Sequence, residues 1–276
     1  MLAVHNDRFM KKRIIRIILG LAILLAVVFV GYFNFQESFL FSPQVLAPDY
    51  TFKFEVPHEE LTLQTGNEGV ISVVKLKADE PKGAIIYCHG SGGNNQSWGD
   101  IMAPITYFGY DIYVWDYRGF GKSTGSMSES ILYADAAAVY DEVAKSYPAD
   151  NIVLYGRSMG GAMACRLAAE RGNKMLMLES PFYELADAGN TFIPGFPPSF
   201  LLRYELAAHK DIVKVETPIV IFHGSEDQVV PIESGYALYQ EVKDKGARWV
   251  PVKGGKHNDL DTFQPFKNVR YEYLGK

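Results

Sequence analysis

The chain has 276 residues, of which 27 are basic and 32 acidic, so its formal net charge is −5. This length is enough for one domain of about 200–250 residues plus an appendage. The body of the sequence carries no long basic patch, and we therefore expect no nucleic-acid partner. Hydrophobic residues make up 48% of the chain and can supply a large core, in which Cys88 and Cys165 are expected as small buried side chains.

The N-terminus differs in composition from everything that follows it. An uncharged apolar run, residues 17–33, comes after a basic flank that includes Arg13 and Arg16. A membrane span needs roughly 17–25 such residues, whereas a signal peptide has about 7–15 and ends in an A-x-A-like site, which we do not find before Gly31. We expect residues 1–33 to be a basic tail and a transmembrane anchor. The basic flank predicts a cytoplasmic N-terminus, with the rest of the chain on the opposite, extracytoplasmic side.

Residues 34–57 are rich in aromatic residues and proline, and we expect them to form a linker that lies against a domain at 58–276. A turn at 65–69 between two alternating runs predicts a β-hairpin. Short apolar runs predict buried strands at 84–88, 111–115, 152–155, 175–178, 219–222 and 248–252. Helices are expected at 98–108, 130–146, 234–243 and 265–274. This alternation predicts an α/β fold, with a mostly parallel sheet and helices on both faces.

The sequence GRSMGG, at 156–161, follows a predicted strand and precedes an Ala-rich segment typical of a helix. In a nucleophile elbow, G-x-S-x-G, small residues let the strand and the helix approach closely as the chain reverses. The serine hydroxyl then lies beside free N–H groups at the helix N-terminus. A serine at this position can also simply cap the helix. The strand before it and the helix after it favour Ser158 as a nucleophile.

Polar motifs follow the predicted strands in a fixed order. They are HGSGGN, WDYRGFGKSTG, GRSMGG, HGSEDQVVP and KHNDL, each at the carboxyl end of a strand, where open parallel sheets carry their sites. From about Glu59 to the C-terminus this ordered set resembles the α/β-hydrolase family. Within that family it is most similar to the membrane-anchored serine hydrolases of the Bem46 and ABHD13 type. The resemblance implies an α/β-hydrolase sheet with a short lid insertion.

The resemblance also implies a catalytic triad in the chain order serine, acid, histidine. Ser158, Asp227 and His257 follow that order, and His257 comes after the last predicted strand. Asp227 would hold the imidazole in the tautomer that can take the serine proton. Glu179 is an alternative acid, because some hydrolases place the acid one strand earlier. Its other interpretation is a buried structural carboxylate.

An oxyanion hole needs two N–H donors near the nucleophile. Met159, directly after the serine, and Ser91, after His89-Gly90, are the expected donors. Asp116 and Arg118 are interpreted as structural, with an ion pair that braces their turn. No metal is expected because no His, Cys or carboxylate cluster has ligand spacing. No cofactor is expected, since no G-x-G-x-x-G follows the first strand.

An apolar, proline-broken insertion at about 182–210 is expected to form a lid over the nucleophile. Phe196 and Phe200 within it are candidates to line a pocket for an acyl chain. The sequence therefore predicts a membrane-anchored serine hydrolase that cleaves an ester, thioester or lipid acyl bond. A peptidase of the prolyl-oligopeptidase kind is an alternative, although such enzymes normally bring a large extra domain. A non-catalytic anchored binding module is a second alternative, which the complete set of triad residues disfavours.

Overall fold

A computed structural model describes residues 2–66, 69–192 and 202–275. The chain forms two compact units, Met1–Phe41 and Ser42–Lys276. The first unit is helix α1, Leu2–Leu40. Its segment Met10–Gly31 is long and apolar enough to cross a membrane, a property that anchors share with signal sequences. Since the helix continues to Leu40, the first part of the segment expected as a linker is helical.

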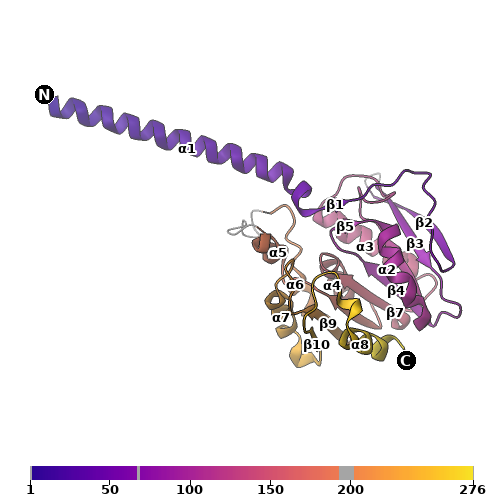
Figure 1. Cartoon of the computed structure of the whole chain (residues 1–276). Helices are drawn as coiled ribbons and strands as arrows, with labels where there is room; N and C mark the ends of the chain where they lie inside the picture. Colours follow the sequence, from indigo (N-terminus) through magenta and orange to yellow (C-terminus); the bar gives the residue numbers. More distant parts are fainter. Residues whose placement is uncertain (1, 67–68, 193–201, 276) are drawn as a thin grey trace. The chain divides into compact units, whose positions relative to one another are not determined.

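The second unit is built on an eight-stranded sheet in the order β10-β9-β8-β7-β4-β6-β3-β2 (Figure 1). Strands β2 and β3 form the predicted hairpin, β3 also pairs antiparallel with β6, and the remaining pairs are parallel. The mostly parallel α/β sheet is therefore confirmed. The strands are β2 His58–Thr65, β3 Gly69–Leu76, β4 Gly83–Cys88, β6 Tyr110–Trp115, β7 Ile152–Arg157, β8 Met175–Glu179, β9 Ile219–Gly224 and β10 Arg248–Val252.

Helices cover both faces of this sheet, as expected. Tyr87, Tyr155 and Phe222 share one apolar cluster with residues of α2 and α8, and the Phe222 and Phe266 rings lie 4.7 Å apart. Helices α3 and α4 pack against the strands of the other face. The helices are α2 Asn95–Met102, α3 Glu129–Val143, α4 Gly160–Glu170, α5 Leu185–Phe192, α6 Ala208–Ile212, α7 Ile232–Gln240 and α8 Gln264–Leu274, with short 3-10 turns η1 Ala103–Phe108, η2 Ala149–Asn151, η4 Lys243–Lys245 and η5 Leu260–Thr262.

One predicted helix is divided in two. The segment expected at 98–108 begins earlier, because Asn94 caps α2 by accepting the backbone N–H groups of Gln96 and Ser97. It then changes to the 3-10 turn η1 at Ala103, next to Pro104, which cannot donate a helical hydrogen bond. The turn ends at Gly109 in the left-handed region, at φ 78°.

The strand-to-helix reversal between β7 and α4 depends on two glycines. A Cβ atom on Gly160 would lie 1.8 Å from the carbonyl oxygen of Cys88, in the neighbouring strand β4. A Cβ on Gly156 would lie 2.6 Å from the Cα of Gly161. Backbone lies against backbone at both positions, so no side chain can be accommodated by a rotamer change.

The contact at Gly160 predicts a large loss of stability on adding one methyl group. Gly160→Ala must displace β4 from α4 and should lower the free energy of unfolding by about 1–3 kcal/mol or more. Gly161→Ala, in the same helical turn, is the matched control. Its Cβ would lie 3.3 Å from Pro181 Cβ, and the helix gains about 1 kcal/mol from Gly→Ala. Denaturant unfolding measures both, and equal losses for the two variants would contradict the packing argument.

Candidate active site

Ser158 occupies a strained turn at the carboxyl end of β7. Its φ is 50°, in the left-handed region that a non-glycine residue enters at a cost of about 1–3 kcal/mol. Its N–H donates to the carbonyl of Glu179 at 2.9 Å, and its own carbonyl accepts the N–H of Gly161 at 2.9 Å. These bonds and the glycine contacts hold the serine between strand and helix, which is the arrangement expected of a nucleophile elbow.

Asp227 and His257 lie together, although 30 positions separate them in the sequence. His257 Nδ1 is 2.7 Å from Asp227 Oδ2. The two residues follow β9 and β10, which are parallel neighbours, so their loops emerge at the same edge of the sheet. Asp227 Oδ1 accepts the N–H groups of Val229 and Val230, each at 2.9 Å. These bonds leave the second oxygen directed at the imidazole.

Burial and hydrogen bonding act in opposite directions on Asp227. Burial by itself would raise the pKa of this carboxyl. The side chains of His223 and His257, together with the Val230 N–H, outweigh that effect and hold the pKa well below its usual range. His223 Nε2 lies 3.4 Å from Asp227 Oδ2 and 3.0 Å from the carbonyl oxygen of Val230. The carboxylate is therefore ionised at neutral pH and can orient an imidazole.

The hydroxyl of Ser158 makes no hydrogen bond within the described part of the chain. Hydrogen bonds between catalytic groups are often long in a free enzyme and shorten when substrate binds. The backbone of His257 is nevertheless tied to the elbow, because Arg157 Nη2 donates to the His257 carbonyl at 3.0 Å. The serine and the His257–Asp227 pair thus belong to one connected edge of the sheet.

The loop that carries Ser91 passes beside the nucleophile. A Cβ built on Gly90 would lie 3.8 Å from Ser158 Cβ. Among the described residues, neither the Ser91 N–H nor the Met159 N–H makes a hydrogen bond. Met159 stands at the N-terminus of α4, where backbone N–H groups have no helical acceptor. Within the described structure, both N–H groups are therefore free to donate to a further acceptor.

The segment expected as a linker contributes directly to this loop. Strand β1, Ser42–Pro43, pairs in parallel with β5, Gly92–Gly93. The Ser42 N–H donates to the Ser91 carbonyl at 2.8 Å, and Trp98 Nε1 donates to the Gly92 carbonyl at 2.7 Å. The sequence did not predict this pairing, because two-residue strands carry no hydrophobic periodicity.

The other polar side chains near the site have structural partners. Arg118 is bonded to Asp135, with Nε 2.8 Å from Oδ2 and Nη2 2.9 Å from Oδ1. The prediction of an ion pair between Asp116 and Arg118 is therefore wrong, because Arg118 pairs with Asp135. Asp116 instead faces His89, with 3.6 Å between Oδ1 and Nε2, and burial raises the pKa of this aspartate.

Glu179, the alternative acid, is engaged elsewhere. Its Oε2 accepts the Tyr155 hydroxyl at 2.7 Å, and its Oε1 lies 3.4 Å from Arg157 Nε. It is a buried carboxylate with structural partners, whereas Asp227 is hydrogen-bonded to His257.

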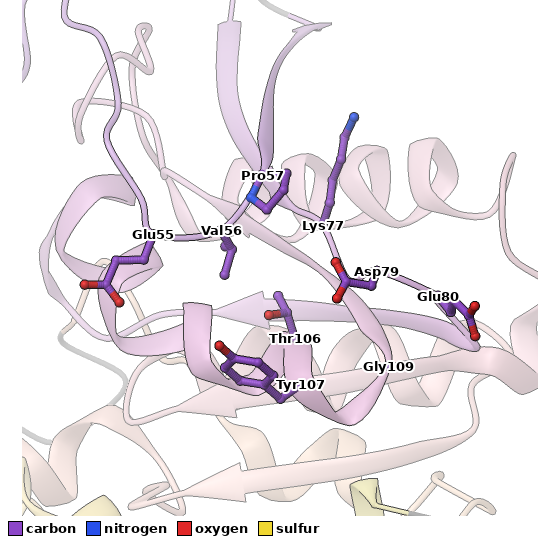
Figure 2. Close-up of a pocket in the computed structure, with 9 residues that line it drawn as sticks. All are labelled: Glu55, Val56, Pro57, Lys77, Asp79, Glu80, Thr106, Tyr107 and Gly109. Atoms are coloured by element: carbon purple, nitrogen blue, oxygen red, sulfur yellow. The ribbon is translucent and has the colours of Figure 1, made fainter.

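Two hollows lie at opposite ends of the parallel strands. A cavity of about 280 Å³ is bordered by His257, Glu226 and Lys256, residues of the loops after β9 and β10. A hollow of about 570 Å³ is lined by Tyr107 and by residues before β2 and after β3 (Figure 2). It lies at the start of β6, and thus at the opposite end of the parallel strands from Ser158. Phe196 and Phe200 lie outside the residues that the structure describes. Among the described residues, no cluster of three metal-ligand side chains occurs.

Comparisons with known proteins agree with this fold. A sequence model of the hydrolase family described as serine aminopeptidase, S33, matches residues 79–203. The Pyrococcus furiosus esterase Pf2001 has a similar structure, with a TM-score of 0.66 at 18% identity over 85% of this chain and 97% of that chain. A monoacylglycerol lipase from Paleococcus ferrophilus has a TM-score of 0.58 at 17% identity, over 74% and 96%. The chain has the α/β-hydrolase fold.

Two relatives with similar sequences are uncharacterized proteins. The uncharacterized protein Rv2307c of Mycobacterium tuberculosis (strain H37Rv) is 31% identical over 64% of this chain. The uncharacterized protein YfhR of Escherichia coli (strain K12) is 29% identical over 66% of this chain. The matches span 63% and 65% of the lengths of these two relatives.

The lowered pKa of Asp227 predicts how stability depends on pH. A depressed carboxyl pKa stabilises the fold above the unfolded value of about 3.9, and this contribution is lost as pH falls through the folded value. The difference in free energy of unfolding between the wild type and Asp227→Asn should therefore shrink between about pH 5 and pH 3. Denaturant unfolding at several pH values measures it.

Asp116→Asn is a contrast of opposite sign. Because burial raises the pKa of Asp116, its side chain destabilises the fold increasingly as pH rises above the unfolded pKa. The stability of the wild type relative to Asp116→Asn should thus fall as pH rises above the unfolded carboxyl pKa of about 3.9, whereas its stability relative to Asp227→Asn rises mainly below that pH and then stays level. The same trend for both variants would contradict the assignment of the two environments.

Proposed function

We propose that this protein is a membrane-anchored serine hydrolase that cleaves an ester, thioester or lipid acyl bond through an acyl-enzyme. The observation that carries the proposal is the 2.7 Å contact between His257 Nδ1 and Asp227 Oδ2, at the sheet edge where Ser158 stands at positive φ. A hydrogen-bonded histidine–carboxylate pair beside a strained elbow serine is suited to general-base activation of that serine.

Each residue has a distinct role in the proposed reaction. Ser158 Oγ attacks the acyl carbon, and His257 Nε2 accepts its proton. Asp227 holds Nδ1–H and stabilises the imidazolium, while the N–H groups of Ser91 and Met159 bind the oxyanion. The intermediate collapses, and the leaving group departs with the proton from Nε2. Water then gives its proton to His257 and attacks the acyl-enzyme, which releases the acid and restores Ser158.

The comparisons support acyl transfer as the reaction class without choosing among substrates. Two structural neighbours are an esterase and a monoacylglycerol lipase. The matching family is described as serine aminopeptidase, which makes peptide amides the second candidate substrate. We favour esters because the sequence resembles the membrane-anchored Bem46 and ABHD13 type of hydrolase.

We assign the acyl chain to the insertion between β8 and β9. The ends of this insertion are packed into the domain, where Phe182, Tyr204 and Leu206 are all buried. Phe196 and Phe200, between those ends, are proposed to line the acyl pocket. The apolar composition of the segment and its position after β8 support this assignment.

Replacement of the elbow serine tests the nucleophile. Ser158→Ala should lower kcat by about 10³-fold or more, because the acyl-enzyme cannot form. Mass spectrometry of the protein labelled with a fluorophosphonate should locate the adduct on Ser158. Ser180→Ala is the control, since Ser180 also stands at positive φ at the end of a neighbouring strand. A label on Ser91, Ser180 or Ser225 would exclude Ser158 as the nucleophile.

The acyl-pocket assignment predicts a chain-length profile. Each buried methylene contributes about 0.8 kcal/mol, so kcat/KM should rise about fourfold per carbon from acetyl to medium-chain p-nitrophenyl esters. Phe196→Ala or Phe200→Ala should flatten this rise and leave acetyl-ester turnover nearly intact. A maximum at acetate would contradict the pocket, and faster cleavage of peptide amides than of any ester would favour the peptidase.

The proposed anchor predicts tight membrane association, with the N-terminus cytoplasmic and the hydrolase domain on the extracytoplasmic side. In a membrane fraction the protein should resist a wash with about 1 M salt, which screens surface charges, and should be released by detergent. Protease added outside the cytoplasmic membrane should digest the domain. A mature N-terminus near Gly31 or Asn34 would instead identify a cleaved signal peptide.

A further inference from the structure

We propose that Arg157 is a positioning residue that holds the loop of His257 against the nucleophile elbow. This inference rests on the proposed function, because it takes His257 as the base that serves Ser158. Arg157 is the last residue of β7 and directly precedes the serine. Its side chain is only 7% exposed.

The guanidinium reaches across two strands to the histidine loop. Nη2 donates to the carbonyl of His257 at 3.0 Å and to Oδ1 of Asn258 at 2.9 Å. The loop follows β10, the last strand of the sheet, and β8 and β9 lie between β10 and β7. Within the sheet, β7 is connected to β10 through β8 and β9. The Arg157 side chain links the end of β7 directly to the loop after β10.

A second group of contacts fixes the guanidinium itself. Arg157 Nε lies 3.4 Å from Glu179 Oε1, while Glu179 Oε2 accepts the Tyr155 hydroxyl at 2.7 Å. The backbone carbonyl of Glu179 accepts the N–H of Ser158 at 2.9 Å. The carboxylate that contacts the arginine and the carbonyl that accepts the serine N–H both belong to Glu179. The positions of Arg157 and Ser158 are therefore fixed by the same residue.

The third contact extends the link to the oxyanion loop. Arg157 Cζ lies 5.0 Å from the centre of the Trp98 ring, a cation–π arrangement. Trp98 Nε1 donates to the carbonyl of Gly92, next to Ser91. One buried cation therefore contacts the histidine loop, the carboxylate at the end of β8 and the indole that braces the oxyanion loop.

The expected effect of losing this link is kinetic. A displacement of about 1 Å between base and nucleophile costs about 10²-fold in rate. Arg157→Gln should therefore lower kcat for a short-chain p-nitrophenyl ester by about 10²-fold, with KM changed by less than about twofold. Arg118→Gln is the matched control: it removes a buried guanidinium from Asp135 without touching the histidine loop. Its kcat, corrected for the folded fraction, should equal that of the wild type.

A double mutant separates positioning from general damage. In the His257→Ala background there is no imidazole to place, so adding Arg157→Gln should change the residual rate by less than about twofold. An equal loss in both backgrounds would overturn the proposal. Asn258→Ala covers the case in which Arg157→Gln does not fold. It removes one acceptor and should lower kcat by about threefold to tenfold, the equivalent of one hydrogen bond.

Failure of this inference and failure of the proposed function give different results. If the wild type neither hydrolyses esters nor reacts with a fluorophosphonate at Ser158, the proposed function fails. If the wild type labels at Ser158 while Arg157→Gln and Asn258→Ala keep the wild-type kcat, Arg157 is not a positioning residue and the proposed hydrolase stands.

Discussion

The reversal of the chain at Ser158 is the constraint on which the rest of the site depends. The backbone turns from β7 into α4 within a few residues, and it does so only because Gly156 and Gly160 admit direct contact with α4 and β4. The serine between them is held at φ 50°, a conformation that persists when the surrounding structure over-determines it. That turn places the Ser158 side chain beside Gly90 and the Met159 N–H at the start of a helix.

Strands β9 and β10 bring the remaining groups to the same edge of the sheet. Because β9 and β10 are parallel to β7, the loops after them emerge beside the elbow, and Asp227 meets His257 there. Electrostatics reinforces the placement: the buried Asp227 carboxylate stays ionised because two imidazoles and backbone N–H groups surround it. Arg157 and Glu179 form a second buried pair, on which the position of the histidine loop relative to the serine depends.

Much of this could be predicted from the sequence, for reasons that are local. Apolar runs revealed the buried strands, and the strand predicted at 248–252 has those bounds. The order of motifs at strand ends placed Asp227 near His257. The partners of buried side chains were not predictable, because they depend on tertiary contacts. Arg118 pairs with Asp135, and Arg157 donates to the carbonyl of His257, 100 positions away. The β1–β5 pairing was missed because it involves two residues in each strand.

The central claim is that Ser158 is the nucleophile and that the N–H groups of Ser91 and Met159 bind the oxyanion of the tetrahedral intermediate. A crystal structure of the full-length protein after reaction with a fluorophosphonate tests it most directly, since the bound phosphonyl oxygen occupies the place of the oxyanion. We predict continuous density from Ser158 Oγ to phosphorus, with that oxygen about 2.7–3.1 Å from both the Ser91 and the Met159 nitrogen atoms. An adduct on another side chain, or a phosphonyl oxygen that contacts neither N–H group, would contradict the account.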